Sequence, residues 1–159
     1  MVDERKLLGD AAIGRLSGTC VLVVDDDEEI RTFLATVLSD EGAATLEAAD
    51  GAEALERAAR ARPDLITLDL SMPGKDGVDA FCELRETPGI DDIPVCVVTG
   101  HPEFRQVIYE RPARPPEGFV TKPVDPDELV QTVRRILGLR QRRATGFAEK
   151  PAASPRCGP

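Results

Sequence analysis

Five short runs of apolar residues, separated by segments of helical character, constrain the fold of this chain more than any other feature. A short continuous apolar run such as Cys20–Val24 is typical of a strand that is buried on both faces. Strands that alternate with helices form a parallel sheet with helices on both of its faces. The sequence therefore predicts an α/β fold, with strands at residues 20–24, 44–48, 65–68, 93–99 and 119–120.

The segments between these runs have the apolar spacing of helices. The last segment begins with Asp125 and Pro126, an acidic cap followed by a proline at the first helical position. The fourth segment is different, because the proline-rich residues 111–116 stop any helix there after about two turns. We expect helices over residues 30–38, 52–61, 78–84 and 125–137, and a short one that opens at 102–106.

Composition divides the chain into three parts. Residues 1–18 are polar, end at the breaker pair Ser17–Gly18 and are expected to form an N-terminal extension with some helical tendency. Residues 19–138 contain the alternating pattern and form one domain. Residues 139–159 are basic and then rich in proline and alanine, which predicts disorder.

The charge and the cysteines exclude several classes of function. A formal net charge of -9 disfavours direct binding to nucleic acid, whose affinity depends on lysine and arginine. The four cysteines include no C-x-x-C pair and His101 is the only histidine, so a zinc site is not expected. The chain has no signal-peptide pattern and no membrane-length apolar run, which predicts a cytoplasmic location and no membrane partner.

Polar residues stand where four of the predicted strands end. Asp25, Asp26 and Asp27 follow the first strand, Asp69 follows the third, Thr99 closes the fourth and Lys122 follows the fifth. Taken singly, each has an ordinary explanation: the acidic run as a helix cap and solvated surface, Asp69 as a turn cap, Thr99 as a strand residue and Lys122 as a solvated side chain. Asp27 in particular suits a helix cap. Open parallel sheets bind ligands beyond the carboxyl ends of their strands, so we expect these side chains to share one cleft.

These residue types together suit phosphoryl transfer. Mg²⁺ prefers oxygen ligands, and Asp26 and Asp69 are suited to bind it directly while Asp25 acts through water. The metal offsets the repulsion between a carboxylate and a phosphoryl group, so Asp69 can act as a nucleophile. Lys122 and Thr99 are suited to stabilise the charge on the transferred group.

Four segments resemble the motifs of the response regulator receiver domain of two-component signalling. The resemblance covers roughly residues 19 to 138, and the motifs are specific in combination. The chain is similar to the single-domain, chemotaxis-regulator type. The resemblance implies a flavodoxin-like, doubly wound five-stranded parallel sheet in the order 2-1-3-4-5. The matching segments are Val23–Asp26, Leu68–Gly77, Val97–Gly100 and Phe119–Pro123.

The resemblance implies a role for each hallmark position around the metal. Asp69 would be the phosphoacceptor. Asp25 and Asp26 would form the acid pocket, and Asp69 and the backbone carbonyl of Ser71 would complete the Mg²⁺ ligands; the resemblance also allows Mn²⁺ in place of Mg²⁺. The domain would catalyse only its own phosphorylation and dephosphorylation and would not be an enzyme otherwise.

The resemblance also implies a switch. Lys122 and Thr99 would hold the phosphoryl oxygens, and Phe119 would follow Thr99 inward, which rearranges the output face of the fourth helix, fifth strand and fifth helix. Phe119 has no hydroxyl to fix its inward state. Ser71 and His101 occupy the positions that tune dephosphorylation in this family. The proline-rich residues 111–116 lie on the output face, which leaves open altered partner recognition or a harmless loop variant.

The implied partners are proteins. A sensor histidine kinase or a histidine phosphotransfer protein would supply the phosphoryl group, and an unknown downstream protein would read the switch, without direct nucleic-acid binding. A homodimer through the output face is compatible with the resemblance. The 21 residues after Gly138 are too few for an output domain. The chain could instead be a fragment of a larger regulator or hybrid kinase.

Three other functions compete with the phosphorylation switch. A haloacid-dehalogenase-type phosphatase requires a second aspartate two residues after the nucleophile, where this chain has Ser71. An EF-hand requires alternating ligands around a central glycine, which Asp25–Asp27 does not provide. A degenerate receiver that acts only as an interaction module is disfavoured by the intact acid pocket, Asp69 and Lys122.

Overall fold

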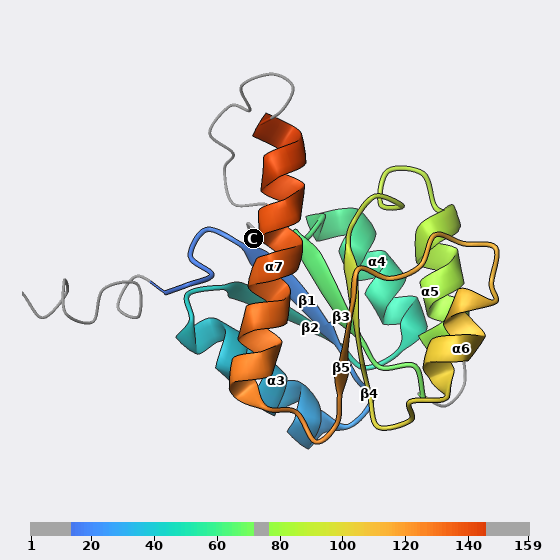
Figure 1. Ribbon diagram of the computed structural model, residues 1–159, viewed down its shortest axis with the longest axis horizontal. Coiled ribbons are helices and arrows are strands. Elements are labelled where there is room, and N and C mark those ends of the chain that lie inside the picture. Colours follow the sequence, from blue (N-terminus) through green and yellow to red (C-terminus); the bar gives the residue numbers. More distant parts are fainter. Residues whose placement is uncertain (1–13, 72–76, 146–159) are drawn as a thin grey trace, which may run out of the picture.

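The sheet has the predicted strands and order. The computed structural model describes residues 14–71 and 77–145, and its five parallel strands lie in the order β2-β1-β3-β4-β5 (Figure 1). Each strand is short, and β1, β3 and β4 are buried along their whole length. The strands are β1 Cys20–Val24, β2 Ala44–Ala48, β3 Leu65–Leu68, β4 Val95–Thr99 and β5 Gly118–Thr121.

All five predicted helices are present. The fourth, α6, is as short as the prolines after it required, and it is followed by an irregular segment up to β5. Within residues 14–71 and 77–145, no helix combines the length and apolarity needed to cross a bilayer. The helices are α3 Glu28–Asp40, α4 Gly51–Ala61, α5 Gly77–Glu86, α6 Phe104–Tyr109 and α7 Pro126–Thr145.

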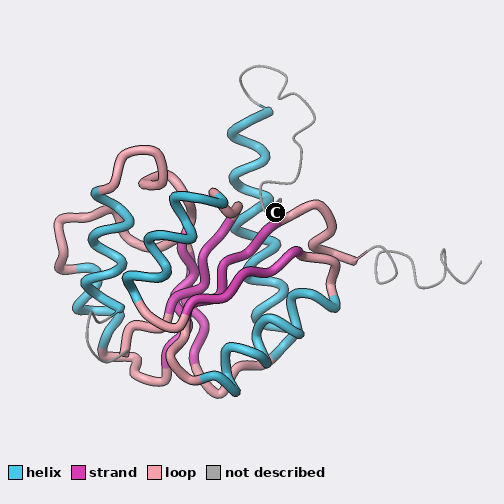
Figure 2. Tube along the Cα trace, turned by 180° about the vertical axis from the view of Figure 1, so that it is seen from behind, coloured by secondary structure: helices cyan, strands magenta, loops and turns pink. Residues whose placement is uncertain are grey.

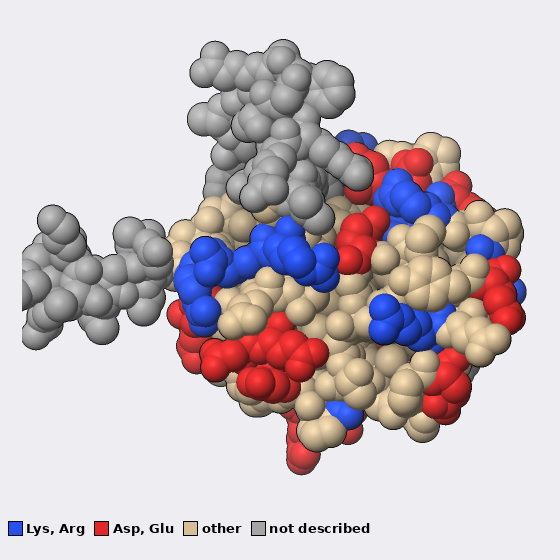
Figure 3. Space-filling view, viewed as in Figure 1, with Lys and Arg blue, Asp and Glu red and all other residues tan. Residues whose placement is uncertain are grey.

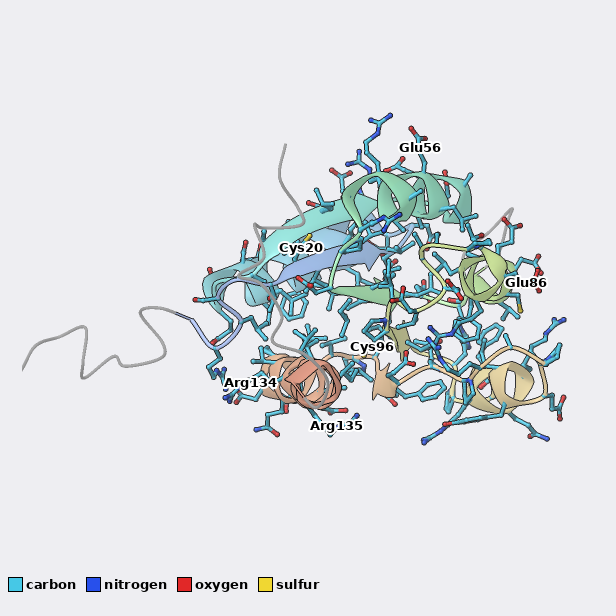
Figure 4. The ribbon with its side chains drawn as sticks, turned by 90° about the horizontal axis from the view of Figure 1, so that it is seen from above. Cys20, Glu56, Glu86, Cys96, Arg134 and Arg135 are labelled. Atoms are coloured by element: carbon cyan, nitrogen blue, oxygen red, sulfur yellow. The ribbon has the colours of Figure 1, made fainter. Side chains whose placement is uncertain are left out.

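The sheet separates two apolar clusters, because successive side chains of a strand point to opposite faces. Leu22 and Val24 of β1 pack with α4, α5 and α6, whereas Val21 and Val23 pack with α3 and α7. Figure 2 shows the sheet between these two groups of helices from behind. Figure 4 shows α4 and α7 on opposite sides, with Glu56 and Arg134 on their outer surfaces. This is the doubly wound arrangement that was predicted.

The two ends of the predicted domain differ from expectation. Leu16 is only 2% exposed and its N–H donates to the Glu41 carbonyl at 2.7 Å, so the last residues of the predicted extension pack on the domain. At the other end, the predicted stop near Leu137 and the disorder predicted from residue 139 are wrong as far as Thr145, because α7 continues to that residue. Gly138 does not break the helix, and the following leucine, arginines and glutamine favour helix.

Parts of three predictions fall outside the described residues. These parts are residues 1–13 of the extension, residues 146–159 of the tail, and residues 72–76 of the motif that follows Asp69. The predicted division of the chain into three parts stays a prediction.

Replacing Thr67 with valine is expected to stabilise the fold. Thr67 is fully buried in β3, and its hydroxyl is the one buried side-chain polar atom without a hydrogen-bond partner in the described part of the chain. Valine has nearly the same shape and removes the desolvated hydroxyl, so the free energy of unfolding should rise by about 1 kcal/mol. Urea unfolding measures it, with Thr121→Val at an exposed β5 position as the control. A less stable Thr67→Val protein would contradict the prediction.

Candidate functional site

Three carboxylates meet at the carboxyl ends of β1 and β3. Oxygen atoms of Asp25, Asp26 and Asp69 lie within 4.8 Å of one another. The backbone explains this meeting, since the Asp69 N–H donates to the Val24 carbonyl at 3.1 Å and so continues the pairing of β3 with β1. Asp25 and Asp69 are 0% and 2% exposed, while Asp26 is exposed and leaves the cluster open to solvent.

Lys122 brings a cation into this cluster from the end of β5. Its Nζ lies 2.9 Å from Asp25 Oδ2 and 3.4 Å from Asp69 Oδ2. The Lys122 backbone N–H donates to the Thr99 carbonyl at 2.9 Å, which places the residue next to the end of β4. The structure thus brings together the side chains of Asp25, Asp26, Asp69 and Lys122, as the strand order predicts.

Ser71 holds the other oxygen of Asp69. Both its backbone N–H and its hydroxyl donate to Asp69 Oδ1, at 3.1 and 2.9 Å. This leaves Asp69 Oδ2 on the side of Lys122. The sequence predicted Ser71 as a backbone metal ligand and as a residue that tunes dephosphorylation. It did not predict the bond from the Ser71 hydroxyl to Asp69, because the direction of a hydroxyl two residues away depends on the local turn.

Asp27 and Arg31 fix the loop that carries the first two carboxylates. The Asp27 side chain caps α3 by accepting from the N–H groups of Glu29 and Ile30, as predicted, and the Asp27 N–H donates to Asp25 Oδ1 at 2.9 Å. Arg31, which the sequence did not single out, donates through Nη1 to the Asp25 carbonyl at 2.8 Å. These bonds orient Asp25 from both sides.

The remaining predicted residues lie beside the cluster. Thr99 is 4% exposed, and its hydroxyl oxygen accepts from the His101 N–H at 3.1 Å. The His101 side chain is exposed and its Nδ1 lies 3.3 Å from a Glu103 carboxylate oxygen. Phe119 is half-buried and packs against α6, with the Arg105 guanidinium 4.8 Å from its ring centre.

The electrostatics of the cluster suit a divalent cation. Burial raises the pKa of Asp25 above its ordinary value, and this outweighs the opposing effects of Lys122 and of the Asp27 N–H. Burial alone would lower the pKa of Lys122, but its bonds and attraction to Asp25 and Asp69 outweigh burial and raise that pKa. Three carboxylates facing one ammonium leave negative charge uncompensated, and hard oxygen donors of this kind fit Mg²⁺.

Replacing Asp25 with asparagine is expected to stabilise the metal-free protein at neutral pH. A folded-state pKa raised above the unfolded value stabilises the fold below the unfolded pKa, and this stability is lost as pH rises through the folded pKa. At pH 7 the buried carboxylate therefore lowers the free energy of unfolding. Its removal should raise the Tm by a few degrees, because a stability change of about 1 kcal/mol shifts the Tm by that much in a domain of this size.

Thermal unfolding with a chelator, at pH 7 and at pH 4, measures this effect. The gain from Asp25→Asn should shrink at pH 4, where Asp25 itself becomes protonated. Asp40→Asn changes an exposed aspartate of α3 and serves as the control. A lower Tm for Asp25→Asn at pH 7 would show that its bond to Lys122 outweighs its burial.

Comparison with known proteins shows which family this chain matches. The response regulator receiver domain family matches residues 21–134. The chain is 38% identical over 143 residues to the transcriptional regulatory protein PrrA of Mycobacterium leprae, which covers 88% of this chain and 59% of that protein. It is 38% identical over 137 residues to the response regulator MprA of the same organism, covering 84% of this chain and 57% of that protein. The chain thus spans less than two thirds of the length of these relatives.

Solved structures give the same result. The chemotaxis protein CheY4 of Vibrio cholerae has a TM-score of 0.67 at 33% identity, with 74% of this chain and 98% of that chain covered. NtrX of Brucella abortus has a TM-score of 0.71 at 30% identity, with 81% of this chain and 29% of that chain covered. The match thus covers almost all of CheY4 but less than a third of the NtrX chain.

Proposed function

Because this chain belongs to the response regulator receiver domain family, we propose that it is phosphorylated on Asp69 and relays this signal to a protein partner. The single observation that carries the proposal is the meeting of Asp69 with Asp25, Asp26 and Lys122 at the carboxyl ends of three strands. A structural ion pair needs only one carboxylate for one lysine. The additional buried carboxylate is costly unless it serves chemistry.

The carboxylates of Asp25, Asp26 and Asp69, with the backbone carbonyl of Ser71, would hold Mg²⁺, and Mn²⁺ offers the same preference for oxygen. Bound there, the metal would screen the repulsion between a carboxylate and an incoming phosphoryl group. Asp25 is oriented for this by the Asp27 N–H and by the Arg31 bond to its carbonyl.

Asp69, Lys122 and Thr99 have separate roles in the phosphoryl transfer. A carboxylate oxygen of Asp69 attacks the phosphorus, and the bond from phosphorus to the donor's histidine nitrogen breaks. Lys122 Nζ, 3.4 Å from Asp69 Oδ2, stabilises the charge on the phosphoryl oxygens. The Thr99 hydroxyl oxygen already accepts from the His101 N–H, so its own proton remains to be donated to the phosphoryl group. Ser71 and His101 border the bound group, where they tune its hydrolysis.

The signal leaves the site through β5. When the Thr99 hydroxyl turns toward the phosphoryl group, Phe119 follows it and changes the face made by α6, β5 and α7, which we call the output face. A histidine kinase or a histidine phosphotransfer protein in the cytoplasm supplies the phosphoryl group, and a protein target reads the output face. The domain acts on no substrate other than its own phosphoryl group.

Intact-mass spectrometry after incubation with acetyl phosphate tests the proposal. We expect one phosphoryl adduct that requires Mg²⁺ and is absent in Asp69→Asn. Asp92→Asn, a change at another aspartate of a surface turn, should leave the adduct intact. A folded protein that gains no adduct and does not bind Mg²⁺ would overturn the proposal in favour of an interaction module that works without phosphorylation.

A further inference from the structure

An aromatic and cationic group stands on the output face between α6 and β5. The Arg105 guanidinium lies 4.8 Å from the ring centre of Phe119, and the Tyr109 ring lies 5.8 Å from that of Phe119 at a tilt of 37°. Tyr109 is 52% exposed although it is a large aromatic residue. We call Arg105, Tyr109 and Phe119 the aromatic–arginine patch.

The short helix α6 is unusually apolar on its surface. In the described residues, three large hydrophobic side chains are exposed, and two of them, Val107 and Tyr109, lie on this six-residue helix. With tryptophan, tyrosine and arginine are the residues most enriched among those that dominate the binding energy of protein interfaces. An exposed tyrosine beside a stacked arginine therefore has the composition of a binding surface rather than of a solvated helix.

Among the described residues, no carboxylate forms an ion pair with the cation of the patch, Arg105. Six arginines of the described residues form ion pairs with carboxylates, namely Arg15, Arg31, Arg57, Arg60, Arg85 and Arg114. Arg105 takes part in none of the ion pairs found in the described chain, and the two glutamates that flank α6 contact other side chains. Glu103 contacts His101, and Glu110 accepts from Gln106 at 3.2 Å.

A guanidinium stacked on a ring keeps its in-plane N–H groups free to bind a carboxylate. Figure 3, in the orientation of Figure 1, shows basic side chains beside α6 and β5 on a molecule that carries extensive acidic surface. Charge complementarity therefore points to an acidic occupant.

Arg85 of α5 bonds to the segment that borders the patch between α6 and β5. Its guanidinium donates to the carbonyls of Ile93, Arg114 and Pro115 and to the carboxylate of Glu117, at 2.8 to 3.0 Å. These bonds tie the proline-rich segment that follows α6 to the body of the domain. A surface that is ordered before binding loses less conformational entropy when a partner docks.

We propose that the aromatic–arginine patch binds an acidic segment of the downstream protein, through a carboxylate on Arg105 and an apolar side chain on Tyr109. This proposal rests on the proposed function, because it names the chemistry of the partner that reads the output face. Phosphorylation changes the position of Phe119 and with it the position of the guanidinium that receives the carboxylate.

Selection from a display library of random 12-residue peptides tests this proposal, with the full chain as bait before and after treatment with acetyl phosphate and Mg²⁺. We expect enriched peptides to combine aspartate or glutamate with an aromatic or branched apolar residue. The affinity of a synthetic copy, measured by fluorescence anisotropy, should fall at least about tenfold in Arg105→Glu and in Tyr109→Ala. Arg60→Glu, an equal charge reversal at an exposed position of α4, should change it less than twofold.

Three results would overturn the proposal: no enrichment on either form, enriched peptides that lack acidic residues, or an affinity that Arg105→Glu leaves unchanged. Sedimentation without peptide tests whether the patch binds a second copy of this chain. A wild-type dimer that dissociates in Arg105→Glu would show that it does. Circular dichroism checks that each variant is folded. The phosphoryl adduct is measured on the same samples, so failure of phosphorylation and failure of peptide binding are seen separately.

Discussion

Replacing Gly77 with alanine is expected to destabilise the protein by about 3 kcal/mol, the upper part of the usual range for overpacking. Gly77 begins α5 and packs directly on the chain that carries Asp69. A Cβ atom there would lie 2.1 Å from the Asp69 carbonyl oxygen and 2.3 Å from the Leu70 Cα. Backbone atoms of a buried strand end cannot move aside as a flexible side chain does, so α5 or the residues after β3 must shift.

The same shift should impair phosphorylation in the fraction that stays folded. A displacement of about 1 Å at a reacting group costs up to about 100-fold in rate. Urea unfolding and the rate of adduct formation from acetyl phosphate measure the two effects. Gly138→Ala is the matched control, because a Cβ at Gly138 meets nothing within 4 Å and alanine favours helix by about 0.5–1 kcal/mol. Wild-type stability and rate in Gly77→Ala would show that the close contact relaxes without cost.

Replacing Lys122 with methionine should slow phosphorylation by about 100- to 1,000-fold, the usual loss when one preorganised donor to a developing charge is removed. Lys122 is the cation that the described residues place against both Asp25 and Asp69. Methionine keeps an unbranched side chain, one atom shorter than that of lysine, and removes the charge. Mg²⁺ binding should persist or tighten, because the three carboxylates lose their competing cation.

Two measurements separate these effects. Time courses of adduct formation at saturating Mg²⁺ report the transfer step, and calorimetric titration with Mg²⁺ reports metal binding. Thr121→Met places the same side chain at the exposed neighbouring residue and should leave both quantities near those of the wild type. Adduct formation at the wild-type rate in Lys122→Met would remove Lys122 from the transfer step.

The sequence predicted the fold well because each prediction relied on local patterns. Continuous apolar runs identified the strands, and β1, β2 and β3 have the predicted limits. Limits that depend on tertiary contacts were less accurate. Strand β5 was predicted at residues 119–120 but spans Gly118–Thr121, because its pairing with β4 joins Cys96 to Gly118 and Thr99 to Thr121. Pro94 precedes β4 instead of lying within it.

The site was predictable where strand ends converge and not where side chains bridge distant segments. Asp25, Asp69 and Lys122 could be brought together from the sequence, since parallel strands share one carboxyl edge. Arg31 and Arg85 could not, because arginines at these positions resemble any solvated arginine of a helix. Their bonds to Asp25 and to the segment before β5 depend on packing across the molecule.

The strand order divides the site between two halves of the chain, because β2, β1 and β3 lie on one side of the sheet and β4 and β5 on the other. The carboxylates and Ser71 belong to the residues up to 71, whereas Thr99 and Lys122 belong to the residues after 77, and the halves meet where β3 pairs with β4. Two separately expressed pieces, divided between these residues, would therefore regain Asp69 chemistry only by reassembling. Phosphoryl uptake would then report fragment complementation, with the nucleophile on one piece and its charge-stabilising lysine on the other.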